Sequence, residues 1–262
     1  MRRFFVAPES IAGDRLTVRG AQGRHLAVVL RLRPGDHILA VDGSGLERVV
    51  ELERVTPEET TGRILDTHPG TQPAIHLTLL QGVPKGSKMD DVIRMGTELG
   101  VAEFIPILTQ RTVAEGRQRT GRWRKIAVEA AKQARRSDIP AVHGPLPLST
   151  ALGLIAGYDL SLLLWEGERE RTVAKALIRT EAASRVAVII GPEGGLEKSE
   201  VDEAVQHGAV PVSLGPLVLR TETAGVVALS IVLYELALRR RAVQDGTSQG
   251  ATPGHPKPFT AG

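Results

Sequence analysis

The chain of 262 residues is long enough for one large domain or two modest ones, and its 42% apolar and 24% charged residues are typical of a globular protein. Aromatic residues make up only 3%, which excludes a broad base-stacking platform for single-stranded nucleic acid. The absence of cysteine excludes disulfides, thiolate metal sites and cysteine nucleophiles. No spacing among the seven histidines is typical of a metal site, so we expect no metal.

Net charge is only +3, but the basic residues are concentrated in one segment. Residues 111–136 contain nine basic side chains against two acidic ones. A solvated helix face would carry interspersed acids, whereas such an excess is expected where a protein binds a polyanion. We therefore predict a surface that faces RNA or DNA. No secretory signal or membrane-spanning run is recognisable, so we expect a cytoplasmic protein without membrane contact.

Short alternating segments bounded by turn signals predict a β-rich domain at residues 1–68, a small barrel of the kind used in recognition. One helix, residues 24–31, interrupts the strands, and a connector rich in Pro, Gly and Thr at residues 67–73 follows them. The predicted strands are residues 3–6, 16–19, 37–41, 46–52 and 60–65.

From residue 75 onward apolar strands alternate with helices, which is typical of a parallel α/β sheet. We predict a second domain at residues 74–243 and a disordered tail at residues 244–262, which lack periodicity and apolar content. The last helix is apolar on most sides, so we expect it to pack against the sheet or a second copy of the chain. The predicted strands are residues 75–80, 103–108, 160–164, 186–190 and 210–214, and the predicted helices are residues 88–99, 120–136, 198–207 and 223–241.

Glycine and proline directly follow two of these strands, in residues 191–195 and 215–216. Glycine lets a ligand approach the main chain, and ligands of open α/β sheets bind beyond the carboxyl ends of the strands. An ordinary tight turn and a helix N-cap explain the same residues without a ligand. The end of a third strand, residues 164–166, is expected nearby, which predicts one pocket. No dinucleotide fingerprint, P-loop or hydrolase elbow is present.

Six segments together resemble one family: RRFFV, GRHL with VLRLRPGD, LLQGVPKGSKMD with TELGV, RWRKIAVEAAKQARR, IGPEGGLEKSEV and SLGPLVLRTETA. The chain resembles the RsmE family over residues 3–238. This resemblance implies a PUA-like β-barrel followed by a knotted (trefoil) SPOUT methyltransferase domain that forms a homodimer. It also implies that S-adenosylmethionine is used to methylate N3 of a uridine in 16S ribosomal RNA, with a small-subunit particle as the partner.

The resemblance places the functional residues by position. The implied cofactor-binding residues are Leu164, Trp165, Glu166, Ile190, Gly191, Pro192, Gly194, Gly195, Leu214, Gly215, Leu219, Thr223 and Ala224. The implied RNA-binding residues are Arg24, His25, Lys85, Lys88, Arg111, Arg124, Lys125 and Arg136.

Two charged residues are the catalytic candidates, because a uridine ring nitrogen carries a proton and is a weak nucleophile at neutral pH. Arg220 would offset the negative charge of the imide anion. Glu222 would either accept the proton or hold Arg220 in place. The second role is favoured, since a carboxylate paired with arginine has a lowered pKa and is a poorer base.

Two other functions remain open on these residues. One is a SPOUT methyltransferase that acts on another base or on a ribose hydroxyl. The other is a ribosome-assembly protein that binds RNA without catalysis, although a simple binder has no need of two glycine-rich pocket loops.

Overall fold

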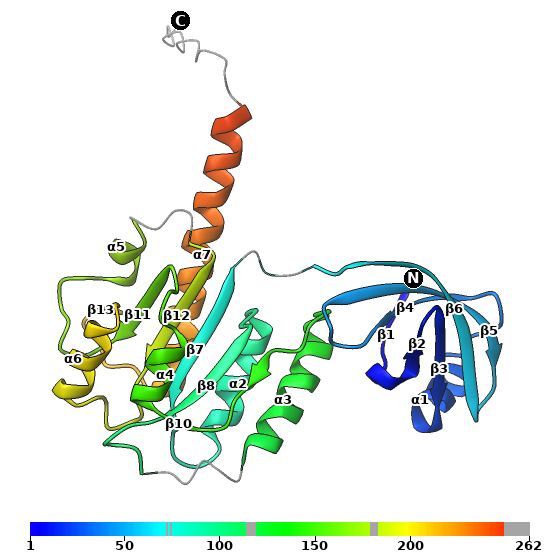
Figure 1. The fold of residues 1–262 in the computed structure, drawn as a ribbon, viewed down its shortest axis with the longest axis horizontal. Coiled ribbons are helices and arrows are strands. Elements are labelled where there is room, and N and C mark those ends of the chain that lie inside the picture. Colours follow the sequence, from blue (N-terminus) through cyan, green and yellow to red (C-terminus); the bar gives the residue numbers. More distant parts are fainter. Residues whose placement is uncertain (72, 74, 114–118, 179–182, 249–262) are drawn as a thin grey trace, which may run out of the picture.

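The computed structural model describes residues 1–71, 73, 75–113, 119–178 and 183–248, and for residues 238–248 it describes only the helical backbone. The chain forms two lobes, each built on one sheet, and a long helix extends from the second lobe (Figure 1). Within these ranges no helix is long and apolar enough to cross a lipid bilayer.

The first lobe is a six-stranded sheet that encloses a small aliphatic core. Alternating residues of its strands turn inward, so that Leu16, Ile38 and Leu52 are fully buried. The predicted helix begins earlier than residue 24, because Gly20 adopts a φ of +65° and turns the chain into α1 (Gly20–Arg24). The other elements are β1 (Arg2–Phe5), η1 (Pro8–Ser10), β2 (Ile11–Ala12), β3 (Arg15–Arg19), η2 (His25–Val29), β4 (His37–Val41), β5 (Leu46–Val55) and β6 (Glu59–Pro69), with strand order β1-β4-β5-β6-β3-β2.

The second lobe is a parallel sheet with strand order β10-β8-β7-β12-β11-β13, and β9 pairs with β8. All five predicted strands are present, and four of them are runs of apolar residues buried on both faces of the sheet. The strands are β7 (His76–Gly82), β8 (Glu103–Leu108), β9 (Ala141–Val142), β10 (Leu146–Pro147), β11 (Leu160–Leu164), β12 (Arg185–Ile190) and β13 (Ala209–Val212).

Helices cover both faces of this sheet and produce two separate cores. Leu79 and Val188 point into one core with α2 (Lys88–Glu98), α3 (Thr120–Gln133), α5 (Val173–Leu177) and α7 (Thr221–Ser248). Leu80 and Ile189, their neighbours in sequence, point into the other core with α4 (Leu148–Leu154) and α6 (Lys198–Gln206). This alternation explains why the strands read as continuous apolar runs.

The final helix corrects the predicted tail. α7 begins at Thr221, two residues before the predicted start, and continues to Ser248. The prediction that residues 244–248 are disordered is therefore wrong, while residues 249–262 lie outside the described part of the chain. One side of α7 is buried against the sheet at Leu229 and Val232, but Tyr234 is 65% exposed.

The two lobes meet through a short segment that follows α3. Arg3 donates to Glu47 Oε1 at 2.7 Å and to Ser137 Oγ at 2.7 Å, and Ser137 Oγ donates to the same Glu47 oxygen at 2.6 Å. The Gly45 N–H also donates to the Ser137 carbonyl at 2.9 Å. The hydrogen bond from Ser137, together with Arg3, lowers the pKa of Glu47 although partial burial opposes it. Side-chain and main-chain bonds therefore join the lobes.

Candidate active site

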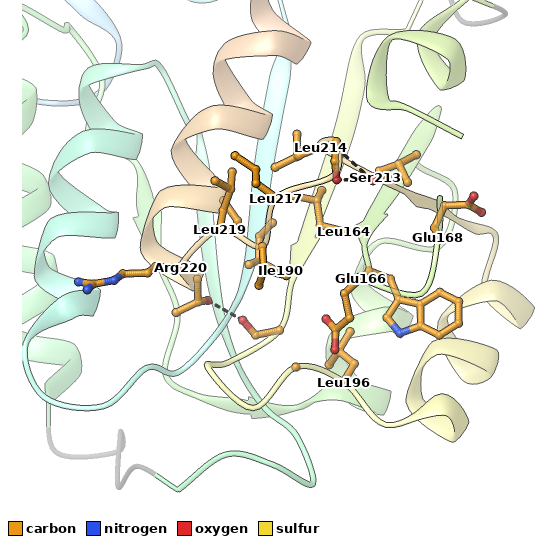
Figure 2. Close-up of a pocket in the computed structure, with 18 of the residues that line it drawn as sticks. Leu164, Glu166, Glu168, Ile190, Leu196, Ser213, Leu214, Leu217, Leu219 and Arg220 are labelled. Carbon is orange, nitrogen blue, oxygen red and sulfur yellow. Dashed lines mark hydrogen bonds between the residues drawn. The ribbon is translucent and has the colours of Figure 1, made fainter. Parts of the chain in front are cut away.

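A cleft of about 1170 Å³ lies where the carboxyl ends of β11, β12 and β13 meet the start of α7 (Figure 2). This is the place predicted from the three strand ends, and it exists because those strands are adjacent and parallel. The cleft is lined by Lys88, Leu164, Trp165, Glu166, Glu168, Arg169, Thr172, Ile190, Gly191, Pro192, Glu193, Gly194, Gly195, Leu196, Val212, Ser213, Leu214, Gly215, Pro216, Leu217, Val218, Leu219, Arg220, Thr221 and Ala224.

The glycine loop, residues 191–195, forms one wall and is held from both ends. Thr221 Oγ1 donates to the Gly191 carbonyl at 2.6 Å, and Gln81 Nε2 donates to Thr221 Oγ1 at 2.7 Å. The Gly195 N–H donates to the Pro192 carbonyl at 2.9 Å, and Gly195 has a φ of +72° that favours glycine. The loop is therefore preformed.

The lid loop, residues 213–220, forms the opposite wall and has few internal bonds. Gly215, with a φ of +118°, donates its N–H to Ser213 Oγ at 3.2 Å. Leu217 and Val218 are 78% and 89% exposed, an unfavourable position for large apolar side chains. A ligand in the cleft would give them apolar surface to cover.

The end of β11 supplies the third wall. Leu164 lies beside Ile190 and the lid loop in Figure 2, and Glu166 points toward the glycine loop. A Cβ on Gly195 would lie 2.8 Å from Glu166 Oε1, so glycine is needed for this approach. Trp165 packs against the second core, and Lys198 Nζ lies 5.7 Å from the centre of its ring.

Charged groups gather on the rim of the cleft. Lys88 Nζ lies 2.9 Å from Glu193 Oε1 and 3.7 Å from Glu222 Oε2. The hydrogen bond to Glu193 raises the pKa of Lys88, while desolvation and nearby Arg220 oppose this shift. Partial burial alone would raise the pKa of Glu193, but hydrogen bonds from Lys88 and from backbone N–H groups lower it.

All predicted cofactor residues except Thr223 line the cleft. Thr223 is exposed on α7. Of the catalytic candidates, Arg220 lines the rim and points away from the aliphatic residues in Figure 2. Glu222 is paired with Lys88, and no ion pair joins it to Arg220 among the described residues. The favoured prediction, that Glu222 holds Arg220, therefore has no contact to support it.

Two predicted RNA-binding arginines have guanidinium groups that bind several partners inside the protein. Arg136 is 7% exposed, and its guanidinium donates to the Thr97 and Val101 carbonyls at 2.9 and 2.8 Å and contacts Asp138. The prediction that Arg136 faces RNA is therefore wrong. Arg111 donates to Glu197 Oε1 at 2.8 Å and to the Gly194 carbonyl at 2.7 Å, so it braces the glycine loop.

Five of the six remaining predicted RNA residues are exposed, and Lys88 is half-buried. Arg124 and Lys125 lie on α3, where Arg124 Nε donates to the Val142 carbonyl at 3.1 Å. Arg24 and His25 lie on the first lobe, and the backbone N–H of Lys85 donates to Glu193. Arg117, part of the basic segment, lies outside the described residues.

Sequence reasoning missed three residues that shape the site. The sequence predicts Thr221 only as a helix cap, but it donates a hydrogen bond to Gly191 of the glycine loop, and Gln81 is buried at the end of β7 next to it. A polar residue inside the apolar run LTLLQG was a usable signal for Gln81. Glu193 lies inside the glycine motif, and no pattern in the sequence indicates a role for it. Its contacts with Lys85 and Lys88 in the structure identify it as part of the site.

The residues present fit S-adenosylmethionine, the cofactor that the resemblance implies. The volume suffices for a ligand of this size, since small-molecule sites span roughly 300–1000 Å³. Aliphatic side chains at Leu164, Ile190 and Leu219 suit a flat apolar ring. The exposed backbone of the glycine loop suits hydrogen bonding to polar groups, and the carboxylate of Glu166 suits a hydroxyl or an ammonium group.

Comparison with known proteins defines the class. A family model described as an RNA methyltransferase domain matches residues 71–233, and another described as an RNA methyltransferase PUA domain matches residues 18–65. Fold and site together are those of an RNA methyltransferase of the SPOUT type with a PUA domain, which confirms the predicted fold class.

Similarity to individual proteins narrows the class. The chain is 30% identical to ribosomal RNA small subunit methyltransferase E of Bacillus subtilis over 92% of this chain and 99% of the relative. It is 35% identical to the protein of the same name from Synechocystis, over 87% of this chain and 76% of the relative. The chain belongs to the ribosomal RNA small subunit methyltransferase E family, the RsmE family. The Neisseria gonorrhoeae member, solved bound to S-adenosyl methionine, is 28% identical with a TM-score of 0.74, covering 89% of this chain and 97% of that one.

Proposed function

We propose that the chain is an S-adenosylmethionine-dependent methyltransferase that modifies N3 of a uridine in small-subunit ribosomal RNA. The observation that carries the proposal is the cleft, where three strand-end loops bring glycine backbone and aliphatic side chains together. Family membership supports the reaction, and the cofactor-bound Neisseria gonorrhoeae structure supports the cofactor.

When bound, S-adenosylmethionine supplies an electrophilic methyl group, so the contribution of the protein is to bind, orient and exclude water. The glycine loop and Glu166 would hold polar groups of the cofactor, and the lid loop would cover it. Arg220 has no ion-pair partner among the described residues, so its charge is free to stabilise a developing anion on the base.

The RNA would lie across the basic side of α3 and the first lobe. Arg124, Lys125, Arg24 and His25 are exposed there, and the proposal assigns residues 1–68 to RNA recognition and residues 74–243 to methyl transfer. A target base inside folded RNA has to leave its stack to enter the cleft, which favours an assembling small-subunit particle as the substrate.

A homodimer and a cytoplasmic location complete the proposal. Tyr234 on α7 is a large aromatic side chain left exposed in one copy of the chain. A second copy would bury it. Sedimentation of wild type and Tyr234→Asp checks this, with a dimer expected for the first and a monomer for the second.

The experiment that tests the function compares nucleosides of small-subunit ribosomal RNA from cells with and without the gene. Loss of N3-methyluridine is expected, and re-expression should restore it. Loss of a ribose methyl group or of another modified base would instead support the related SPOUT activity. Calorimetry with S-adenosylmethionine tests the non-catalytic alternative, since a simple RNA binder gives no heat of cofactor binding.

The RNA face has its own test. Arg124→Glu combined with Lys125→Glu should lower RNA affinity at least about tenfold and reduce the salt dependence, because phosphate contacts are lost. Arg94→Gln is the control, because Arg94 is exposed on α2 but already pairs with Asp91 and Glu98. Unchanged affinity of the double variant would remove α3 from the RNA surface.

A further inference from the structure

Lys88 sits between two carboxylates at the mouth of the cleft. Its ammonium hydrogen-bonds Glu193 of the glycine loop at 2.9 Å and lies 3.7 Å from Glu222 of α7. The two carboxylates offset the charges of the ammonium and of nearby Arg220, which leaves no net positive charge to attract phosphate. Lys88 is therefore poorly suited to the RNA backbone, in contrast to Lys125, which is exposed and has no ion-pair partner among the described residues.

Glu222 has hydrogen-bonding capacity that the protein does not use. Its side chain is 17% exposed and accepts no hydrogen bond from a described residue, and Oε2 is buried beneath Lys88. The adjacent Thr221 is hydrogen-bonded to Gly191 and Gln81, so the first turn of α7 holds the carboxylate beside Lys88, which lines the cleft. A largely buried acceptor without a donor is costly unless a ligand supplies the donor.

The chemistry of a uracil ring matches this pair. Its imide edge presents a carbonyl, an N–H and a second carbonyl, so a protein needs a cationic donor beside a carboxylate acceptor to read it. We propose that Lys88 and Glu222 together recognise the imide edge of the target base, Lys88 donating to a carbonyl oxygen and Glu222 accepting from N3–H. Glu193 is a positioning residue that tethers Lys88.

This inference rests on the proposed function and specifies how that site selects its base. Glu222 takes the N3 proton, so an O–H bond forms as the N–H bond breaks. The electron pair stays on N3 and would form the bond to the methyl carbon as the bond between that carbon and the donor sulfur breaks, with its electron pair left on sulfur. Negative charge spreads to the carbonyl oxygens beside Lys88, and the proton on Glu222 later passes to water. Cytosine carries no hydrogen on N3, so the same pair rejects it.

The experiment measures single-turnover methyl transfer to small ribosomal subunits isolated from cells that lack the gene, between about pH 6.5 and 9.5. Glu222→Gln should lower the rate at pH 7 by about 100-fold or more, and the rate should recover as pH rises because the imide then loses its proton to solvent. Lys88→Met should cause a loss of about 100-fold without that recovery. Glu193→Gln should cost about tenfold, because only the tether is lost.

A second readout needs no cofactor. The salt dependence of RNA binding by the cofactor-free protein should be the same for Lys88→Met and wild type, whereas loss of a phosphate contact lowers the salt slope by about one. Arg94→Met, on the same helix, is the matched control for both readouts. Glu222→Asp keeps the carboxylate and should recover part of the rate, and cofactor affinity verifies that each variant is folded.

The outcomes separate the inference from the function. Wild-type rates for Glu222→Gln and Lys88→Met would overturn the inference, as would a slow Glu222→Gln whose rate does not rise with pH. A reduced salt slope for Lys88→Met would make Lys88 a phosphate contact. A wild-type protein that methylates no small-subunit RNA would overturn the proposed function and the inference with it.

Discussion

The two loops that face each other across the cleft differ in how the protein holds them. The glycine loop, residues 191–195, is bound through Thr221, Arg111, Lys85 and Lys88, and its first two residues are buried. The lid loop, residues 213–220, has one internal side-chain bond pair and leaves two large apolar residues in solvent.

This difference shows that one wall of the cleft, the glycine loop, is preformed, whereas the other wall, the lid loop, is loosely held. A preformed wall loses little conformational entropy when a ligand binds, so it can supply precise hydrogen bonds. A loose wall costs more to order but allows entry and release. We therefore expect changes at the glycine loop to affect stability and affinity together, and changes at the lid loop to affect affinity alone.

The largest effect should come from Gly82→Ala, beneath the glycine loop. A Cβ there would lie 2.6 Å from the Gly191 carbonyl carbon and even closer to Pro192, so the rigid loop would have to move. We expect a loss of about 3 kcal/mol, or roughly 100-fold in cofactor affinity, with a lower melting temperature. Calorimetry measures both, and Gly153→Ala, which has open space, is the control. A Gly82→Ala protein with the cofactor affinity and melting temperature of wild type would show that the glycine loop is not rigid.

Thr221→Val should have the next largest effect. The change keeps the shape but leaves the Gly191 carbonyl without its donor and Gln81 Nε2 without the nearer of its two acceptors. We expect a loss of about 1–3 kcal/mol in the free energy of unfolding, and roughly tenfold weaker cofactor binding. Urea unfolding and titration calorimetry check this. Thr223→Val, at an exposed position outside the cleft lining, should match wild type, and equal losses in both variants would contradict the rigid-wall account.

A double change in the lid, Leu217→Ser with Val218→Ser, should act on binding only. Both side chains are exposed without ligand, so unfolding should change by less than about 0.5 kcal/mol. Cofactor affinity should fall roughly fivefold through faster dissociation, since about 1 kcal/mol of apolar cover is lost. Stopped-flow release measures the rate. A large drop in melting temperature would show that the lid is also part of the folded framework.

Acid should produce the smallest effect, through Glu193. Because its folded-state pKa is lowered from 4.5, its ion pair is complete above that value and is lost as pH falls through the lowered pKa. Below about pH 4.5 wild type should lose cofactor affinity by up to threefold more than Glu193→Gln, which lacks the titrating group. Cofactor affinity measured against pH for both proteins isolates this contribution. The same pH dependence in both proteins would show that the ion pair does not stabilise the glycine loop.

The sequence predicts the sheet well and the side-chain partners poorly. Buried strands such as β8 and β11 match the predicted residues because a doubly covered strand is a continuous apolar run. Periodicity misses α5, because five residues make little more than one turn. Motif spacing locates the glycine loop because the backbone itself requires glycine there.

Charged residues show most clearly that side-chain partners cannot be predicted from the sequence. Arg124 and Arg136 belong to one basic segment, yet Arg124 is exposed while Arg136 is buried against two carbonyl groups. Lys88 and Glu222 lie 134 positions apart, and only the packing of α7 against α2 brings them together. Such pairings depend on the tertiary structure, which a linear pattern does not encode.

The junction of Arg3, Glu47 and Ser137 has a consequence for how one nucleotide is chosen among many. Because this junction joins the segment after α3 to the first lobe, it fixes the distance between the first lobe and the cleft. An RNA bound to the first lobe, as we propose, would then bring to the cleft only a nucleotide that lies at this distance. The three-dimensional shape of such an RNA, and not only the identity of the base, would contribute to the choice.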